Sequence, residues 1–95
     1  MTKTIILNFL KEHKAELQQR FNVQKIGLFG SYAKNEARED SDIDIAITVS
    51  KKDFFLREDL KEYLQNYLHT AVDVGYIDSF REYYRTKIEK EIIYV

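Results

Sequence analysis

Residues 26–45 read IGLFGSYAKNEAREDSDIDI, and this stretch decides the fold of the chain. It starts within a short, partly β-branched segment, Val23 to Phe29, which favours a strand. Gly30 and Ser31 end that strand, and the residues from Tyr32 to Ala37 suit a short helix that starts at the serine. From residue 42 polar and apolar residues alternate, as in a strand that enters a core. The stretch therefore predicts a strand, a turn with a short helix, and a second strand.

The segments on either side alternate between helix and strand. Apolar residues at helical spacing predict one amphipathic helix over residues 2–20 and another after residue 50. Capping patterns at Ser50–Asp53 and Ser79–Glu82 predict the starts of the later helices. Residues 71–77 predict a third strand, and residues 92–95 a short extended end. The expected fold is α/β (α+β), with a small mixed sheet of about three strands covered by helices.

Composition sets the class of protein. The 95 residues are 44% hydrophobic and 33% charged, which predicts a single globular domain over residues 1–95. Fifteen basic residues against sixteen acidic ones argue against a protein that binds nucleic acid directly. No apolar run approaches the roughly 20 residues of a membrane span, and no secretory signal is recognised. Cysteine is absent, so we expect a cytoplasmic protein without disulfides or thiolate chemistry.

The first feature that points to chemistry is the pair Asp42 and Asp44. Side chains two residues apart on a strand point to the same face, so both carboxylates converge while Ile43 and Ile45 face the opposite layer. Carboxylates about 5 Å apart repel each other by about 3 kcal/mol at an effective dielectric near 20. A hard cation such as Mg²⁺ would relieve that repulsion. Taken alone, the pair is better explained as a polar strand start that caps a loop.

Two further features, the Gly30-Ser31 turn and Asp73, could belong to the same site as that pair. Gly30 and Ser31 allow a tight turn with a close backbone approach, which favours an anion such as phosphate, although taken alone an ordinary turn with Ser31 as the helix cap fits better. Asp73 lies in the otherwise apolar segment of the third strand, where a buried carboxylate needs partners. Gly75 shares its face and would leave open space beside it. The alternative is that Asp73 lies on an edge strand and faces water.

Together these residues carry a resemblance to a known family. Gly30-Ser31, ten further residues and then Asp42-x-Asp44, with Asp73 on a later strand, resemble the minimal nucleotidyltransferase family of the DNA polymerase β superfamily. The order of elements and the length agree too, so the resemblance covers nearly the whole chain. It implies the polymerase-β-like nucleotidyltransferase fold.

The chain departs from the family pattern in the loop between the two strands. Lys34 stands where arginine is common, which keeps the charge but loses bidentate phosphate contacts. Asn35 stands where glycine is frequent, and asparagine tolerates the left-handed conformation that glycine would take. Glu39 stands where proline is frequent.

The resemblance also implies an activity. Asp42, Asp44 and Asp73 would be catalytic and would hold two Mg²⁺ ions, while Gly30 and Ser31 would bind ATP. Asp73 would in addition help to deprotonate the attacking hydroxyl. The reaction would transfer AMP to that hydroxyl and release pyrophosphate.

By the same resemblance, the partner would be a HEPN-type ribonuclease toxin. The protein would then be the antitoxin of a toxin–antitoxin pair, acting by AMPylation of a toxin tyrosine and by forming a complex with the toxin. Two alternatives remain open at this point. The domain could be an inactive module that neutralises the toxin by binding alone, or it could modify a small molecule such as an antibiotic.

Overall fold

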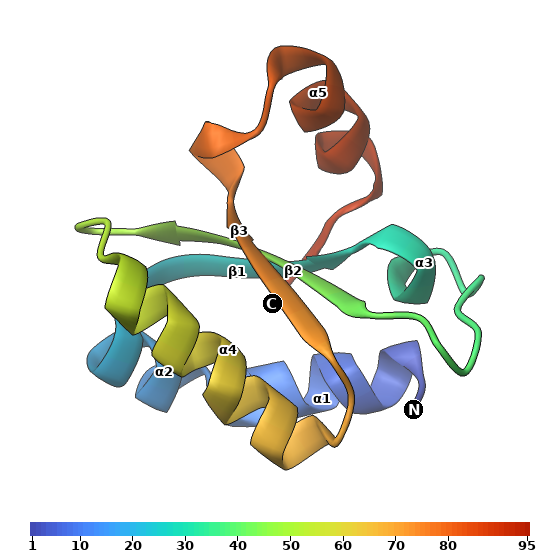
Figure 1. Cartoon of the computed structure of the whole chain (residues 1–95), viewed down its shortest axis with the longest axis horizontal. Coiled ribbons are helices and arrows are strands. Elements are labelled where there is room, and N and C mark those ends of the chain that lie inside the picture. The colour runs from blue at the N-terminus through green and yellow to red at the C-terminus, as the bar shows by residue number, and fades with distance from the viewer.

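A four-stranded mixed sheet, ordered β3-β2-β1-β4, forms the centre of the molecule. The computed structural model describes all residues, 1–95. The central strands β1 (Val23–Phe29) and β2 (Ile43–Val49) are antiparallel, β3 (Val72–Tyr76) runs parallel to β2, and β4 (Ile93–Tyr94) is antiparallel to β1 (Figure 1). The expected mixed α/β fold is confirmed. The short extended end pairs with β1, so it adds a fourth strand to the three that were expected.

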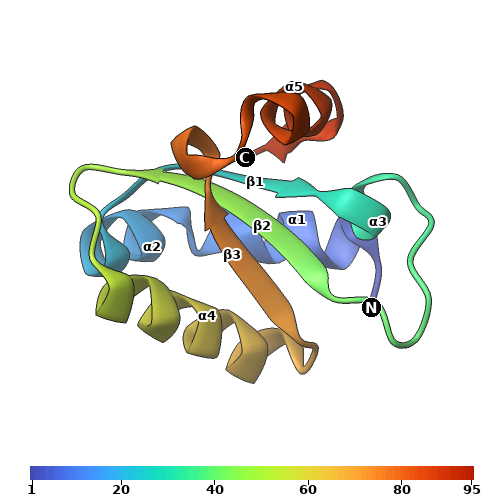
Figure 2. The same ribbon diagram turned by 45° about the horizontal axis from the view of Figure 1, so that its top comes forward.

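The helices cover the two faces of the sheet unequally. One face packs against α1 (Lys3–Glu12), α2 (Lys14–Phe21) and α4 (Phe54–Leu68), as both views show (Figures 1 and 2). The other side carries only α5 (Glu82–Glu91), which follows the short 3-10 helix η1 (Ile77–Ser79). The four-residue helix α3 (Gly30–Ala33) continues from the end of β1. None of these helices is long and apolar enough to cross a membrane.

The core lies between the sheet and the layer of α1, α2 and α4. Strand alternation places Ile43, Ile45 and Ile47 in this core, each at most 1% exposed. The helices contribute further side chains that are fully buried: Ile6, Leu10, Leu17, Leu60 and Leu64. Burying side chains of this size stabilises the fold by about 1.5–3 kcal/mol each. The same alternation turns Asp44 toward the opposite, more open side of the sheet.

The parallel connection from β2 through α4 to β3 determines where the strands begin. A parallel pair joined by a crossover helix starts at the same edge of the sheet. Ile43 is thus opposite Val72, and Asp44 is opposite Asp73. The sheet register therefore brings two residues that are 29 positions apart in the sequence into one row.

The single helix predicted over residues 2–20 is wrong, because the chain breaks at His13. Its backbone has φ −103° and ψ 8°, outside helical geometry. Its Nδ1 lies 2.9 Å from the carbonyl oxygen of Phe9, which also accepts the His13 backbone N–H at 3.1 Å. A side chain that competes for a helix carbonyl in this way disturbs the regular bonding. The apolar stripe continues across the break, so periodicity alone did not reveal it.

The predicted caps are also wrong in position. Helix α4 begins after Asp53, whose Oδ1 accepts the backbone N–H of Leu56 at 3.2 Å, so Ser50 plays no part. Helix α5 begins after Arg81 without a side-chain cap. Ser79 belongs to η1, and its hydroxyl accepts a hydrogen bond from Lys52 Nζ at 2.9 Å. Its engagement with a distant lysine is a tertiary contact that a local pattern does not predict.

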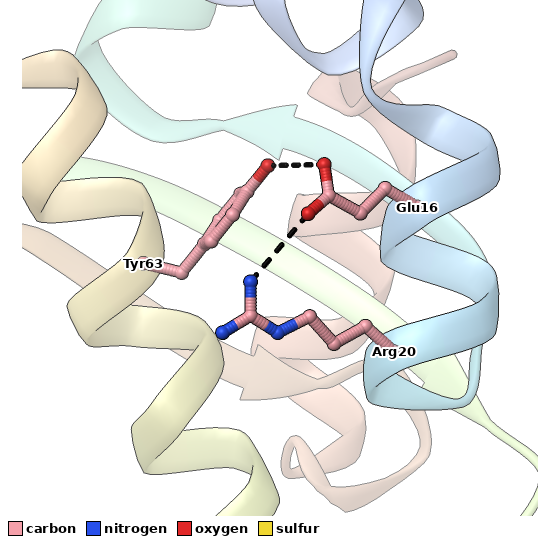
Figure 3. A network of polar contacts seen from close by, with 3 residues as sticks. All are labelled: Glu16, Arg20 and Tyr63. Atoms are coloured by element: carbon pink, nitrogen blue, oxygen red, sulfur yellow. Dashed lines mark hydrogen bonds and ion pairs between the residues drawn. The ribbon is translucent and has the colours of Figure 1, made fainter.

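A polar network ties α2 to α4 on the helical face (Figure 3). The hydroxyl of Tyr63 donates to Glu16 Oε2 at 2.9 Å, and Arg20 Nη1 lies 3.5 Å from Glu16 Oε1. Burial, followed by the hydrogen bond to Glu16, raises the pKa of Tyr63 to about 12. This network lies on the face of the sheet away from the aspartates, so it contributes to the scaffold.

Candidate active site

The predicted site residues lie together along one edge of the sheet, the one formed by the end of β1 and the starts of β2 and β3. Gly30 follows the last residue of β1, and Asp42 immediately precedes the first residue of β2. Asp44 is paired with Phe29 of β1 on one side and with Asp73 of β3 on the other. The end of β1 and the starts of β2 and β3 meet there because β1 is antiparallel to β2 while β3 is parallel to it.

Asp44 is the electrostatic centre of this edge. Its side chain is half-buried. Burial, followed by the negative charges of Asp73, Asp42 and Glu91, raises the pKa of Asp44 to about 6. Three neighbouring carboxylates therefore oppose the ionisation of Asp44. Such crowding is typical of a site that receives a cation or a proton.

Gly30 is required at its position for two reasons. Its φ is +75°, which side-chain-bearing residues rarely adopt. A Cβ atom there would also lie 3.0 Å from Cγ and 3.1 Å from Cβ of Asp44, and it would collide with the carboxylate oxygen Oδ2. The sequence predicted a tight turn with a close approach, and the group that approaches is Asp44.

The rest of the turn differs from expectation in detail. The short helix covers residues 30–33 instead of starting at Ser31 and reaching Ala37, and no side chain caps it, so the alternative role of Ser31 as a helix cap is wrong. The chain leaves the helix through Asn35, whose φ of 58° is left-handed. The expectation that asparagine tolerates this conformation in place of glycine is confirmed.

Asp73 does not lie in a buried central strand. Strand β3 is the outermost strand on one side of the sheet, and Asp73 is exposed to solvent. Its position opposite Asp44 nevertheless keeps it within the acidic group. The open space predicted beside Gly75 is also absent, since a Cβ there would lie 2.7 Å from Cζ of Phe80. The chain after β3 folds back over the sheet, and its aromatic ring fills that space.

Glu91 is a residue of this edge that the sequence did not predict. It is the last residue of α5, and its Oε1 accepts the backbone N–H of Gly30 at 3.3 Å. Its Oε2 lies 3.6 Å from Nζ of Lys34, and its side chain is only 17% exposed. The residue is 61 positions from Gly30 and ends an ordinary amphipathic helix, so no local signal marks it.

The aspartate carboxylates of this edge suit Mg²⁺ that is also coordinated by a phosphate. No three His, Cys, Asp or Glu side chains are arranged so as to hold a metal ion by themselves. Mg²⁺ in phosphate-transfer sites is commonly bound by one or two carboxylates together with substrate phosphate oxygens. Asp42 and Asp44, beside Asp73, offer hard oxygen ligands of this kind. A cation bound there would favour the ionised form of Asp44, whose pKa burial and the neighbouring charges otherwise raise to about 6.

The structure places the glycine turn beside Asp44, and these are the motifs on which the sequence resembles the nucleotidyltransferases. Residues 10–95 match the nucleotidyltransferase domain family, and the chain belongs to that family. The protein adenylyltransferase MntA of Thermococcus cleftensis is 38% identical over 96 residues, which cover 100% of this chain and 97% of that protein. The expected family and the expected class of enzyme, a nucleotidyltransferase, are confirmed.

Solved structures share the fold. A structure described as a minimal nucleotidyltransferase has a TM-score of 0.81 and 28% identity, over 98% of this chain and 95% of the other. A toxin–antitoxin structure with AMP-PNP has a TM-score of 0.71 and 24% identity, over 99% and 72% of the two chains. The complex of a tri-AMPylated Shewanella oneidensis HEPN toxin with its MNT antitoxin has a TM-score of 0.66 and 23% identity, over 92% and 69%.

Proposed function

We propose that this protein transfers AMP from ATP, with Mg²⁺, to a tyrosine hydroxyl of a HEPN-type ribonuclease toxin and thereby acts as its antitoxin. The observation that carries the proposal is the position of Asp44, which lies opposite Asp73, close to Asp42, and against the backbone of Gly30. A chain that belongs to the nucleotidyltransferase domain family and has acidic residues in this arrangement is equipped for nucleotidyl transfer.

In this proposal each site residue has a defined task, and Asp73 has two. Gly30 and Ser31 receive the triphosphate, whose oxygens accept hydrogen bonds from the turn. Asp42 and Asp44 would hold Mg²⁺, and Asp73 would complete the set of ligands. The bound cation supplies positive charge that offsets the charge on the reacting phosphate. Its presence also favours the ionised form of Asp44, whose pKa is otherwise raised to about 6.

Asp73 is suited to accept the proton of the attacking hydroxyl. The hydroxyl oxygen forms a bond to the α-phosphorus, the bond from that phosphorus to the bridging oxygen breaks, and pyrophosphate leaves. The proton of the hydroxyl passes to the Asp73 carboxylate. Asp73 is exposed on the edge strand, so a side chain of another protein can approach it from solvent. This exposure favours a macromolecular acceptor over a small molecule enclosed in a pocket.

The identity of the acceptor rests on the relatives. The Thermococcus relative is named a protein adenylyltransferase, and one structural neighbour contains an AMPylated HEPN toxin bound to an MNT antitoxin. A second neighbour was solved with an ATP analogue. A complex with such a toxin, a cytoplasmic location, and no direct contact with nucleic acid are parts of the same proposal.

Transfer from labelled ATP tests this function. The purified protein, its HEPN partner and Mg²⁺ are incubated with ATP labelled either at the α-phosphate or at the γ-phosphate. The partner should gain the α-label and not the γ-label, and mass spectrometry should locate one or more AMP groups on tyrosine. Asp42→Asn and Asp73→Asn should each lower the rate by about 100-fold or more.

Asp40→Asn is the matched control, because Asp40 is an exposed aspartate two residues before Asp42, in the turn that precedes β2. This control should transfer AMP at the normal rate. Equal labelling by all variants, or no labelling by the unaltered protein, would overturn the enzymatic proposal. If the Asp42 and Asp73 variants still neutralised the toxin without labelling it, the domain would act as a binding module.

A further inference from the structure

Glu91 occupies two donors that face the proposed nucleotide site. Its carboxylate accepts the Gly30 backbone N–H at 3.3 Å and lies 3.6 Å from the Lys34 ammonium. Under the proposed function, the Gly30 N–H belongs to the turn that would meet a triphosphate, and the Lys34 ammonium is a cation beside that turn. An internal carboxylate therefore stands where an anionic ligand is expected.

The C-terminal chain fixes Glu91 at this position. Ile93 of β4 pairs with Leu28 of β1, and the Val95 N–H donates to the Ile26 carbonyl at 3.1 Å. Gly27 lets this segment come close, because a Cβ there would lie 2.7 Å from Cγ1 of Ile92. Glu91 immediately precedes Ile92, so the pairing of β4 with β1 holds the end of α5 against the turn.

The contact also carries a cost. The carboxylates of Asp42, Asp44 and Asp73 already crowd this edge, and the charge of Glu91 adds to the repulsion at Asp44. Only the Gly30 N–H and the Lys34 ammonium offset it. A backbone N–H donates one good hydrogen bond, so Glu91 and a phosphate oxygen cannot both be fully bonded to Gly30. Lys34 Nζ also lies 4.0 Å from Glu36 Oε2, so a phosphate would be a further anion at this lysine and would be repelled by both carboxylates.

We propose that Glu91 competes with the triphosphate of the nucleotide for the Gly30 N–H and the Lys34 ammonium, so that this residue sets the affinity of the site for nucleotide. The inference rests on the proposed function, since it requires the triphosphate to reach the turn. It adds a residue from the far end of the chain to the determinants of nucleotide binding. In this proposal Glu91 weakens the binding of the phosphates and does not affect the binding of the nucleoside.

Isothermal titration of the full chain in Mg²⁺ tests the competition with three probes: ATP, inorganic tripolyphosphate and adenosine. Glu91→Gln keeps the size and one acceptor oxygen of the side chain but removes its charge. This variant should bind ATP and tripolyphosphate roughly five- to twentyfold more tightly than the unaltered protein, with adenosine binding unchanged.

Glu89→Gln is the matched control. It removes the same charge from the same helix, but Glu89 is exposed and pairs with Arg85 at 2.9 Å, away from the turn. The control should change the affinity for ATP by less than about twofold, since exposed charges act weakly over such distances.

A second measurement needs no variant. In the unaltered protein, the side-chain carboxyl carbon resonance of Glu91 should shift on titration with tripolyphosphate, with the same midpoint as the Gly30 amide resonance. A shift at Gly30 without one at Glu91 would overturn the competition. Equal or weaker binding of ATP by Glu91→Gln would do the same while leaving the proposed function intact. If the unaltered protein bound no ATP at all, both the proposed function and this inference would fail.

Discussion

The backbone of Gly30 lies directly against the carboxylate of Asp44, so closely that no side chain fits between the turn and the acidic strand. This contact joins the two halves of the family motif in space. It aligns the turn that is proposed to receive the triphosphate with the carboxylates that are proposed to hold the metal. The packing of the turn against β2 and the proposed chemistry thus both depend on Gly30 and Asp44.

Gly30→Ala should destabilise the fold by about 2–4 kcal/mol. Its φ of +75° costs an alanine about 1 kcal/mol, and the collision of Cβ with Asp44 accounts for the remainder. Urea unfolding measures the change. In a double-mutant cycle with Asp44→Ala, the second substitution should remove most of the collision but not the backbone cost. Strictly additive effects would show that the collision is absent.

Asp44→Asn should stabilise the metal-free protein at pH 7. The pKa of Asp44 is raised from 3.8 to about 6 in the folded chain, so the folded state binds this proton more tightly than the unfolded state does. Its contribution to stability is fully present below about pH 4 and is lost as the pH rises through 6. Replacing the aspartate should therefore gain on the order of 1–2 kcal/mol at pH 7 and little at pH 4.

Urea unfolding at both pH values in EDTA checks this difference, because carboxylates far from Asp44 titrate alike in the two proteins. Asp40→Asn, at an exposed position, should show no such pH-dependent gain. A stability difference between Asp44→Asn and the unaltered protein that stayed constant from pH 4 to pH 7 would contradict the prediction.

Mg²⁺ should bind tightly only together with nucleotide. No three potential ligands are arranged to hold a metal ion alone, so phosphate oxygens must complete the coordination. Titration calorimetry should detect little binding of Mg²⁺ to the free protein, and clear binding once a non-hydrolysable ATP analogue is present. EDTA should abolish AMP transfer, and excess Mg²⁺ should restore it. Transfer that persists in EDTA would contradict the assignment of the aspartates as metal ligands.

Tyr63→Phe should lower stability without affecting catalysis. The substitution removes the hydrogen bond from the hydroxyl to Glu16, at a cost of about 0.5–1.5 kcal/mol. The pKa of Tyr63 is raised from 10.0 to about 12 in the folded chain, so its contribution is present below pH 10 and is lost as the pH rises through 12. Urea unfolding at pH 8 and in this alkaline range measures both effects, and AMP transfer should remain normal. If the folded variant lost AMP transfer, the hydrogen bond between Tyr63 and Glu16 would have a role in catalysis, which would contradict this prediction.

Local sequence determined the strands and the chemistry that they carry. Alternation in residues 42–49 fixed which face of β2 is buried, so Ile43 and Ile45 lie in the core while Asp44 faces the open side. The glycine at position 30 and the asparagine at position 35 indicated special backbone conformations, and both have positive φ. These features follow from side-chain geometry within a few residues, which is why one sequence sufficed to predict them.

Only the tertiary structure decided which distant residues meet. The pairing of β4 with β1 brings Glu91 to Gly30, and the fold-back after β3 places Phe80 over Gly75. The position of β3 at the sheet edge exposes Asp73. Such contacts depend on strand order and on packing between segments dozens of residues apart, and periodicity carries no information about either. The sequence thus determined the acidic groups of the site, and the packing of the C-terminal chain determined what lies against them.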